Sequence, residues 1–166
     1  DMLVPDKRVP FPAFFVKSKT KTEQRMFVAH LARNWARVQH QRGYRGAVMV
    51  DIDDTLIDGN ENVVNGFQFM KDVYKEIGTL FPLHVVTARP HDDHAKCMDM
   101  LVRRGFCIPP DRLHMLPAHL YGKSHTHVED FKWNTCCAIS STHRGVVLRM
   151  GDKMWDVAHL SLIHIS

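Results

Sequence analysis

The feature that most constrains the fold is a short apolar run that stops abruptly at two carboxylates. Residues Ala47 to Val50 are all apolar, and Asp51 and Asp53 follow directly. A continuous apolar run of this length is typical of a central strand in a parallel sheet that helices cover on both faces. We therefore expect a parallel sheet whose buried strand brings acidic side chains to its carboxyl end.

Strand and helix patterns alternate along the rest of the chain. Apolar runs typical of strands occur at Leu83 to Val86, which ends at Thr87, at Arg112 to Leu116 and at Val146 to Met150. Apolar spacing and end signals predict helices near residues 65–77 with Gly78 as terminator, from Pro90 to Gly105, and from Asp130 as N-cap through Ile139. This alternation predicts a three-layer, Rossmann-like α/β sandwich with a central parallel sheet.

An amphipathic helix is expected before the sheet. Thr20 and Glu23 form a capping-box pattern, and the helix should end near Gly43. Apolar residues recur at helical spacing and predict the face turned toward the core: Phe27, Leu31, Trp35 and Val38.

Charge is distributed unevenly along the 166 residues, whose formal net charge is +4. Residues 1–45 contain ten Lys and Arg against three Asp and Glu, a net charge of +7, whereas residues 46–166 carry a net charge of −3. A basic segment of this kind attracts phosphate-rich partners, and a solvated helix face gives the same count. The charge of this segment is therefore compatible with a nucleic-acid partner but does not establish one.

Composition indicates the cellular compartment and argues against a transition-metal site. The four cysteines include no CxxC pair, so reduced thiols in a cytoplasmic protein fit best. His125, His127 and Glu129 lie close in sequence, but among twelve histidines such a cluster arises by chance. No run approaches the roughly 18 apolar residues that cross a bilayer, and no leader pattern opens the chain. We expect a cytoplasmic protein without a membrane span.

Three of the predicted strands end in polar residues, and the carboxylates that follow two of them suit a magnesium site. Asp51 and Asp53 project to the same side of an extended chain and repel each other unless a cation or a proton intervenes. Asp152 and Asp156 add two carboxylates, and an oxygen-rich, sulfur-free cluster is what Mg²⁺ prefers. The alternative from the residues alone is that 51–54 form only a turn after the strand.

Residues 46–157 resemble the haloacid dehalogenase (HAD) superfamily of phosphohydrolases in the order and spacing of four motifs. Its DxDxTL motif is similar to Asp51 to Leu56, and the strand that ends in Ser or Thr is similar to the one ending at Thr87, with Ala88-Arg89-Pro90 behind it. The lysine motif is matched best by Lys132, less well by Lys123. The final GDxxxD motif is similar to Gly151 to Asp156. Cys136 departs from the acid-phosphatase-like (class III) branch, which tends to carry Arg there.

The resemblance implies a Mg²⁺-dependent phosphomonoester hydrolase with its catalytic domain at residues 46–166. Asp51 would attack phosphorus and form an aspartyl-phosphate, while Asp53 would protonate the leaving oxygen and later take a proton from water. Thr87 and Lys132 would contact phosphate oxygens. The metal ligands implied are Asp51, the backbone carbonyl of Asp53, Asp152 and, in the near or outer shell, Asp156.

The intervals between the motifs predict a capless enzyme. Only 31 residues separate Thr55 from Thr87, which leaves room for a small flap at Leu56 to Val64 and none for a cap domain. Capless members of the superfamily tend to accept bulky substrates or to close the site by oligomerisation. The superfamily fold usually continues after the last motif, so a truncated C-terminal edge of the sheet is expected.

Two alternative functions remain open at this point. One is a nucleotide or nucleic-acid-end phosphatase that uses basic residues such as Lys17, Lys19 and Lys21. The other is a phosphate-binding scaffold that keeps the fold without turnover. The presence of both motif aspartates at Asp51 and Asp53 speaks against the scaffold. The phosphorylated substrate and the oligomeric state do not follow from the sequence.

Overall fold

Strands and helices alternate in the computed structural model, which describes residues 13–15, 21–53, 55–57 and 68–151. The strands are β1 (Ala13–Phe15), β2 (Ala47–Val50), β3 (Leu83–Pro90), β4 (Leu113–Leu116) and β5 (Val146–Gly151). The helices are α1 (Lys21–Gln41), α2 (Gln68–Leu80), α3 (His94–Arg103) and α4 (His125–His143), with short 3-10 helices η1 (His91–Asp93), η2 (Pro110–Arg112) and η3 (Ala118–Leu120).

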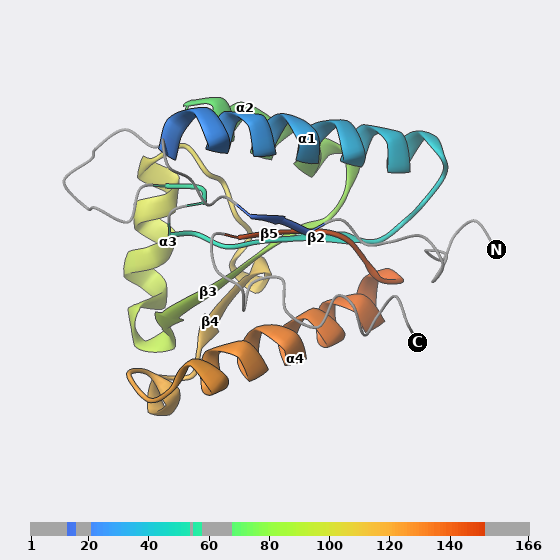
Figure 1. Ribbon diagram of the computed structural model, residues 1–166. Helices are drawn as coiled ribbons and strands as arrows, with labels where there is room; N and C mark the ends of the chain where they lie inside the picture. The colour runs from blue at the N-terminus through green and yellow to red at the C-terminus, as the bar shows by residue number, and fades with distance from the viewer. Residues whose placement is uncertain (1–12, 16–20, 54, 58–67, 152–166) are drawn as a thin grey trace.

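The five strands form one parallel sheet in the order β1-β5-β2-β3-β4 (Figure 1). β2 lies at the centre, and its last residue, Val50, pairs in register with Val85 of β3 and Met150 of β5. Because parallel strands all point the same way, the residues that follow these three strands meet at one edge of the sheet. The expected α/β sandwich with a central parallel sheet is confirmed.

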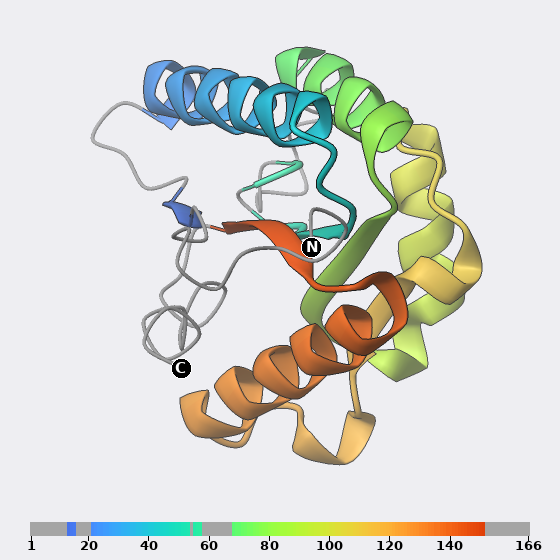
Figure 2. The ribbon, with the colours of Figure 1, turned by 90° about the vertical axis from the view of Figure 1, so that its right-hand side faces the viewer.

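Helices cover both faces of the sheet. α1 and α2 lie above it in Figure 1 and α4 lies below, and the turned view in Figure 2 shows the same arrangement. One core cluster joins residues of α1, α2 and α3 to one face of the strands, and a smaller cluster joins Cys136 and Ile139 of α4 to Met49 and Val86 on the other face. β2 is buried along its whole length between these layers, as its apolar run predicts.

The buried face of α1 differs from the predicted stripe. Leu31 and Val38 are 39% and 47% exposed. The fully buried residues lie instead on a face of small side chains: Ala29, Ala32 and Ala36. Alanines allow α1 to approach the sheet and α2 closely, so shape outweighs hydrophobicity in choosing the buried face.

Trp35 alone among the described members of the stripe turns toward the core. It packs against the core cluster, and its indole N–H donates to the carbonyl of Val147, 3.2 Å away. The side chain of Phe27 lies outside the described residues. Trp35 therefore joins α1 to β5 through an apolar ring and one hydrogen bond.

Several predicted boundaries are wrong. Pro90, expected in the first turn of a helix, is the last residue of β3, and α3 begins only at His94, after η1. α2 continues through Gly78 to Leu80, since Gly78 lies exposed with open space around it and glycine does not have to end a helix. β3 continues beyond Thr87 to Pro90, with a shift in its register to β4 between these residues. α4 begins at His125 after Ser124 in the N-cap position, so Asp130 lies inside the helix.

The early start of α4 is supported by a local hydrogen bond. Ser124 Oγ and His127 Nδ1 are 2.7 Å apart, and the backbone N–H of His127 donates to the carbonyl of Ser124 at 3.1 Å. His125 and His127 therefore belong to the first turn of α4, before the helix start predicted at Asp130.

Two broader expectations can be compared with the described residues. No helix among them has both the length and the apolar character that a membrane crossing requires. All four cysteines are free thiols: Cys97 and Cys136 are buried, and Cys107 and Cys137 are exposed.

Candidate functional site

The candidate site begins where β2 leaves the sheet. The backbone N–H of Asp51 donates to the carbonyl of Met150 at 3.0 Å, so pairing between β2 and β5 extends to this residue. Asp51 is buried, and Gly151, the last residue of β5, is buried beside it. Asp152 and Asp156 lie outside the described residues.

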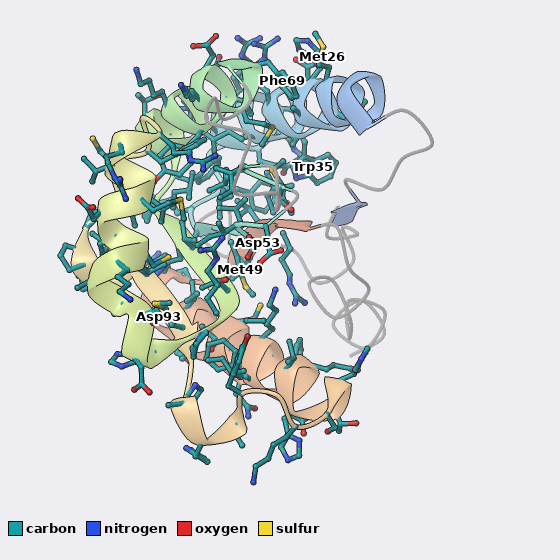
Figure 3. All side chains as sticks on the ribbon, turned by 90° about the vertical axis from the view of Figure 1, so that its left-hand side faces the viewer. Met26, Trp35, Met49, Asp53, Phe69 and Asp93 are labelled. Carbon is teal, nitrogen blue, oxygen red and sulfur yellow. The ribbon has the colours of Figure 1, made fainter. Side chains whose placement is uncertain are left out.

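A tight turn around one carbonyl follows Asp51. The carbonyl of Ile52 accepts the backbone N–H groups of Thr55, Leu56 and Ile57 at 3.2, 2.9 and 3.2 Å. The side chains of Ile52, Leu56 and Ile57 are buried, so apolar packing holds the turn from within. Asp53, which is labelled in Figure 3, is only half-buried. The DxDxTL sequence thus fixes two aspartates in two environments.

Asp51 forms a buried ion pair with Lys132. Lys132 Nζ lies 3.0 Å from Asp51 Oδ1, and the two side chains are 1% and 9% exposed. Lys132 comes from the second turn of α4, 81 residues away in sequence, and reaches the sheet edge from below β2. Because a buried charge is costly without a partner, each group stabilises the charged form of the other.

Asp53 is held by Arg89 in a two-point ion pair. Arg89 Nε donates to Asp53 Oδ2 at 3.0 Å, and Arg89 Nη2 donates to Asp53 Oδ1 at 2.7 Å. Thr87, which is fully buried, accepts the backbone N–H of Arg89 on its hydroxyl oxygen at 3.1 Å. The end of β3 is therefore joined to the turn after β2 through side chains.

The remaining sequence candidates lie away from this edge. Lys123 is exposed between η3 and α4, and its backbone N–H donates to the carbonyl of Leu120 at 3.3 Å. Within the described ranges, no group of three or more His, Cys, Asp or Glu could hold a metal, and this includes His125, His127 and Glu129.

The described part of the expected magnesium site has the right donor chemistry but too few ligands by itself. Asp51 contributes carboxylate oxygens, which a hard cation prefers. Arg89 contacts both carboxylate oxygens of Asp53, so the donor that Asp53 would offer is its backbone carbonyl, as the resemblance implies. Asp152, which the resemblance implies as a further carboxylate ligand, follows Gly151 in the sequence.

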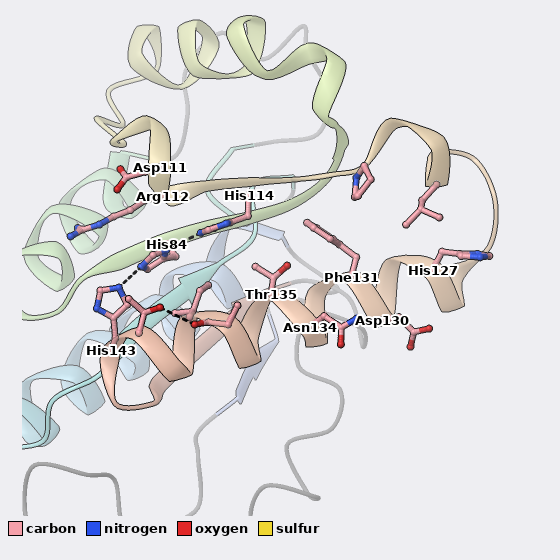
Figure 4. Close-up of a pocket in the computed structure, with 15 residues that line it drawn as sticks. His84, Asp111, Arg112, His114, His127, Asp130, Phe131, Asn134, Thr135 and His143 are labelled. Atoms are coloured by element: carbon pink, nitrogen blue, oxygen red, sulfur yellow. Dashed lines mark hydrogen bonds between the residues drawn. The ribbon is translucent and has the colours of Figure 1, made fainter.

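A second polar cluster, three hydrogen-bonded histidines, was not predicted. His84 Nδ1 lies 2.9 Å from His114 Nε2, and His84 Nε2 lies 2.9 Å from His143 Nε2 (Figure 4). These rings line a cavity of about 710 Å³ between β3, β4 and α4. Burial lowers the pKa of His84 to about 4, and the neighbouring His114 and His143 add to this effect. Burial also lowers the pKa of both outer histidines.

One sequence signal could have located this histidine cluster. His84 and His114 each stand as the single polar residue in a short apolar strand, Leu83 to Val86 and Leu113 to Leu116. A polar side chain in such a strand needs a partner on the neighbouring element, and a second histidine on an adjacent strand is a suitable one. The third ring, His143, enters from the end of α4, and spacing alone does not reveal it.

Part of the N-terminal basic charge is used inside the fold. Arg33 and Arg37 of α1 both pair with Glu76 of α2. The guanidinium of Arg42 lies 5.2 Å from the centre of the Tyr44 ring. Lys17 and Lys19 lie outside the described residues. These contacts give three of the basic residues a structural role.

Comparison with known proteins adds no assignment. No protein-family model, no curated protein and no solved structure matches this chain. Its function is therefore inferred from the residues at the carboxyl edge of the sheet.

Proposed function

We propose that the protein is a Mg²⁺-dependent phosphomonoester hydrolase of the HAD superfamily that acts through an aspartyl-phosphate on Asp51. One observation carries the proposal: Lys132 on α4 contacts Asp51 at the end of the central strand. An acidic nucleophile beside a buried cation, at the edge where parallel strands end, suits attack on a phosphoryl group. This contact joins the first and third motifs of the superfamily.

Asp51 is suited to act as the nucleophile. Its ion pair with Lys132 orients the carboxylate, and burial removes most of the competing water. Attack by a carboxylate oxygen forms the Asp51 O–P bond while the bond from phosphorus to the leaving oxygen breaks. One difficult hydrolysis is thus divided into two displacements.

Thr87 and Lys132 are suited to bind the transferring phosphoryl group. A hydroxyl has one hydrogen to donate, and Thr87 uses its oxygen, not that hydrogen, to hold the N–H of Arg89. An ammonium group has three hydrogens, so Lys132 can hold Asp51 and also donate to a phosphate oxygen. Loss of one such donor typically lowers the rate by about 10² to 10³.

Asp53 is suited to move the proton. It is more exposed than Asp51, as a group that meets a leaving oxygen and then a water molecule must be. In the first step it gives a proton to the leaving oxygen. In the second step water attacks phosphorus, the Asp51 O–P bond breaks, and Asp53 takes the proton from water. Bound Mg²⁺, which Asp51, the Asp53 carbonyl and Asp152 would hold, would offset the negative charge on the phosphoryl oxygens.

The site has no cap domain in this proposal. The flap expected at Leu56 to Val64 lies largely outside the described residues, and α2 begins at Gln68. An open site admits bulky phosphate esters. The scaffold alternative would require that Asp51, Thr87 and Lys132 bind phosphate without turnover.

The nucleic-acid alternative is less favoured. Arg33, Arg37 and Arg42 already have partners within the fold, which weakens the case for a dedicated polyanion-binding arm. A steep dependence of nucleic-acid binding on salt concentration, lost when Lys17, Lys19 and Lys21 are neutralised, would favour it again.

Hydrolysis of an aryl phosphate, with Mg²⁺ and with a chelator, tests the proposal. The protein should release phosphate only with the metal, and Asp51→Asn should lower turnover by about 10³ or more. If the parent protein and Asp51→Asn behave alike over a broad panel of phosphate esters, the proposal is wrong.

A further inference from the structure

The two-point contact between Arg89 and Asp53 has a geometry that does more than neutralise charge. Arg89 Nε and Nη2 donate to different oxygens of Asp53, at 3.0 and 2.7 Å. The side chains are 25% and 39% exposed, so the pair lies at the mouth of the site and not in the core. A guanidinium that donates two parallel hydrogen bonds fixes the plane of a carboxylate, which a single contact does not.

The backbone around Arg89 holds the guanidinium in place. The N–H of Arg89 is bound by the hydroxyl oxygen of the buried Thr87. Pro90 follows, and a residue before proline is restricted to extended backbone conformations. Pro90 itself is extended, with φ −71° and ψ 143°. The Thr87 to Pro90 segment therefore presents Arg89 in a defined direction.

The contact leaves Asp53 able to carry a proton. A carboxylate has about four lone-pair positions, and Arg89 occupies one on each oxygen. One lone-pair position on each oxygen therefore remains for a proton.

We propose that Arg89 is a positioning residue, which fixes the plane of the Asp53 carboxyl so that its proton meets the leaving oxygen. This inference rests on the proposed hydrolase function. The loss of rate when Arg89 is replaced should therefore be larger for leaving groups that need a proton more. An alkoxide leaves poorly without a proton, whereas a para-nitrophenolate leaves readily without one.

Leaving-group dependence of kcat separates this role from others. Propyl phosphate and para-nitrophenyl phosphate are compared with the parent protein, Arg89→Gln and Arg89→Lys. We expect Arg89→Gln to lower kcat by about 10² for propyl phosphate and only a few-fold for para-nitrophenyl phosphate, with KM little changed for either. Arg89→Lys keeps the charge without the planar fork and should recover little of the loss.

Two control variants calibrate the comparison. Asp53→Asn removes the acid itself and should show the same preference for the aryl ester. Arg103→Gln removes an exposed arginine that forms an ion pair with the exposed Asp99, and should change neither rate. Thermal unfolding of each variant shows whether it is folded at the assay temperature.

Other outcomes overturn the inference in distinguishable ways. Equal loss on both esters, or a large rise in KM, would assign Arg89 to phosphate binding or to folding and leave the hydrolase function standing. Unchanged rates in folded Arg89→Gln would overturn the positioning role alone. Failure of the parent protein to hydrolyse either ester would overturn the proposed function, and the role of Arg89 with it.

Discussion

Lys132 Nζ lies 3.0 Å from Asp51 Oδ1, in an ion pair that is almost completely buried although its partners are 81 residues apart. The pair joins α4 to the central strand β2 and lies at the point where the strands of the sheet end. Its effects on stability and on chemistry can be measured separately, since Lys132 and Asp51 can be changed singly and together.

Removal of Lys132 should destabilise the fold strongly. Lys132→Met leaves the buried carboxylate of Asp51 without its cation, and loss of one partner from a buried pair costs about 3–5 kcal/mol. The double variant Lys132→Met/Asp51→Asn should be more stable than Lys132→Met alone, because no unpaired charge remains. Urea unfolding measures both, with the exposed Lys123→Met as a control that should change stability little. Equal losses in the two single lysine variants would contradict the account.

The histidine cluster can hold only one additional proton with both of its hydrogen bonds intact. Each of the two contacts around His84 needs one hydrogen, and the outer Nδ1 atoms of His114 and His143 can carry one each. Three neutral rings already have three hydrogens, so one position remains. A second added proton must break one of the two contacts, either His84–His114 within the sheet or His84–His143 between the sheet and α4.

Acid should therefore weaken the fold through the histidine cluster. The pKa of His84 is lowered to about 4 from 6.5, so between these values the unfolded chain binds more protons than the folded one. The free energy of unfolding should fall as pH decreases through this window, by up to about 1.4 kcal/mol per pH unit for each extra proton bound. Arg112 adds to the depression and Asp111 opposes it.

Replacement of His84 tests that assignment. Urea unfolding of His84→Leu at several pH values should give a shallower decline between pH 6.5 and 4 than the parent shows. His119→Gln changes an exposed histidine outside the cluster and should keep the steep decline. An unchanged slope in His84→Leu would contradict the role of the cluster.

Replacement of two glycines by alanine should change the stability of the fold in opposite directions. A Cβ at Gly46 would lie 2.9 Å from the carbonyl oxygen of Gly145 and 2.9 Å from Val147 Cγ1, so Gly46→Ala should destabilise by about 1–3 kcal/mol. A Cβ at Gly78 meets nothing within 4 Å, and α2 continues through that residue. Gly78→Ala should stabilise by about 0.5–1 kcal/mol. Thermal unfolding checks both; stabilisation by Gly46→Ala would show that the β2 start is packed differently.

Strands β2 to β5 were predictable because their burial is simple, whereas no sequence pattern predicted β1. Ala47 to Val50 are apolar and buried on both faces, and the structure gives β2 the predicted bounds. The face of α1 was not predictable in the same way, since Leu31 and Val38 are more apolar than the alanines that replace them in the core. Close packing of helices depends on shape, and hydrophobic spacing does not report shape.

In the site, too, one feature could be predicted from the sequence and another could not. Placement of Asp51 at the end of a central strand followed from the apolar run before it. The pairing of Arg89 with Asp53 depends on how the turn after β2 and the end of β3 approach each other, and on the hydroxyl of Thr87 that holds the Arg89 backbone. Local sequence patterns do not encode such contacts between loops.

Trapping the phosphorylated protein tests the central claim most directly. The protein is mixed with a phosphate ester labelled in its phosphoryl group and with Mg²⁺, quenched in acid within one turnover, and digested to locate the label. The account predicts label on the peptide that contains Asp51, released by hydroxylamine as an acyl phosphate must be, and none in Asp51→Asn. Steady turnover of the ester with no label on Asp51 would contradict it.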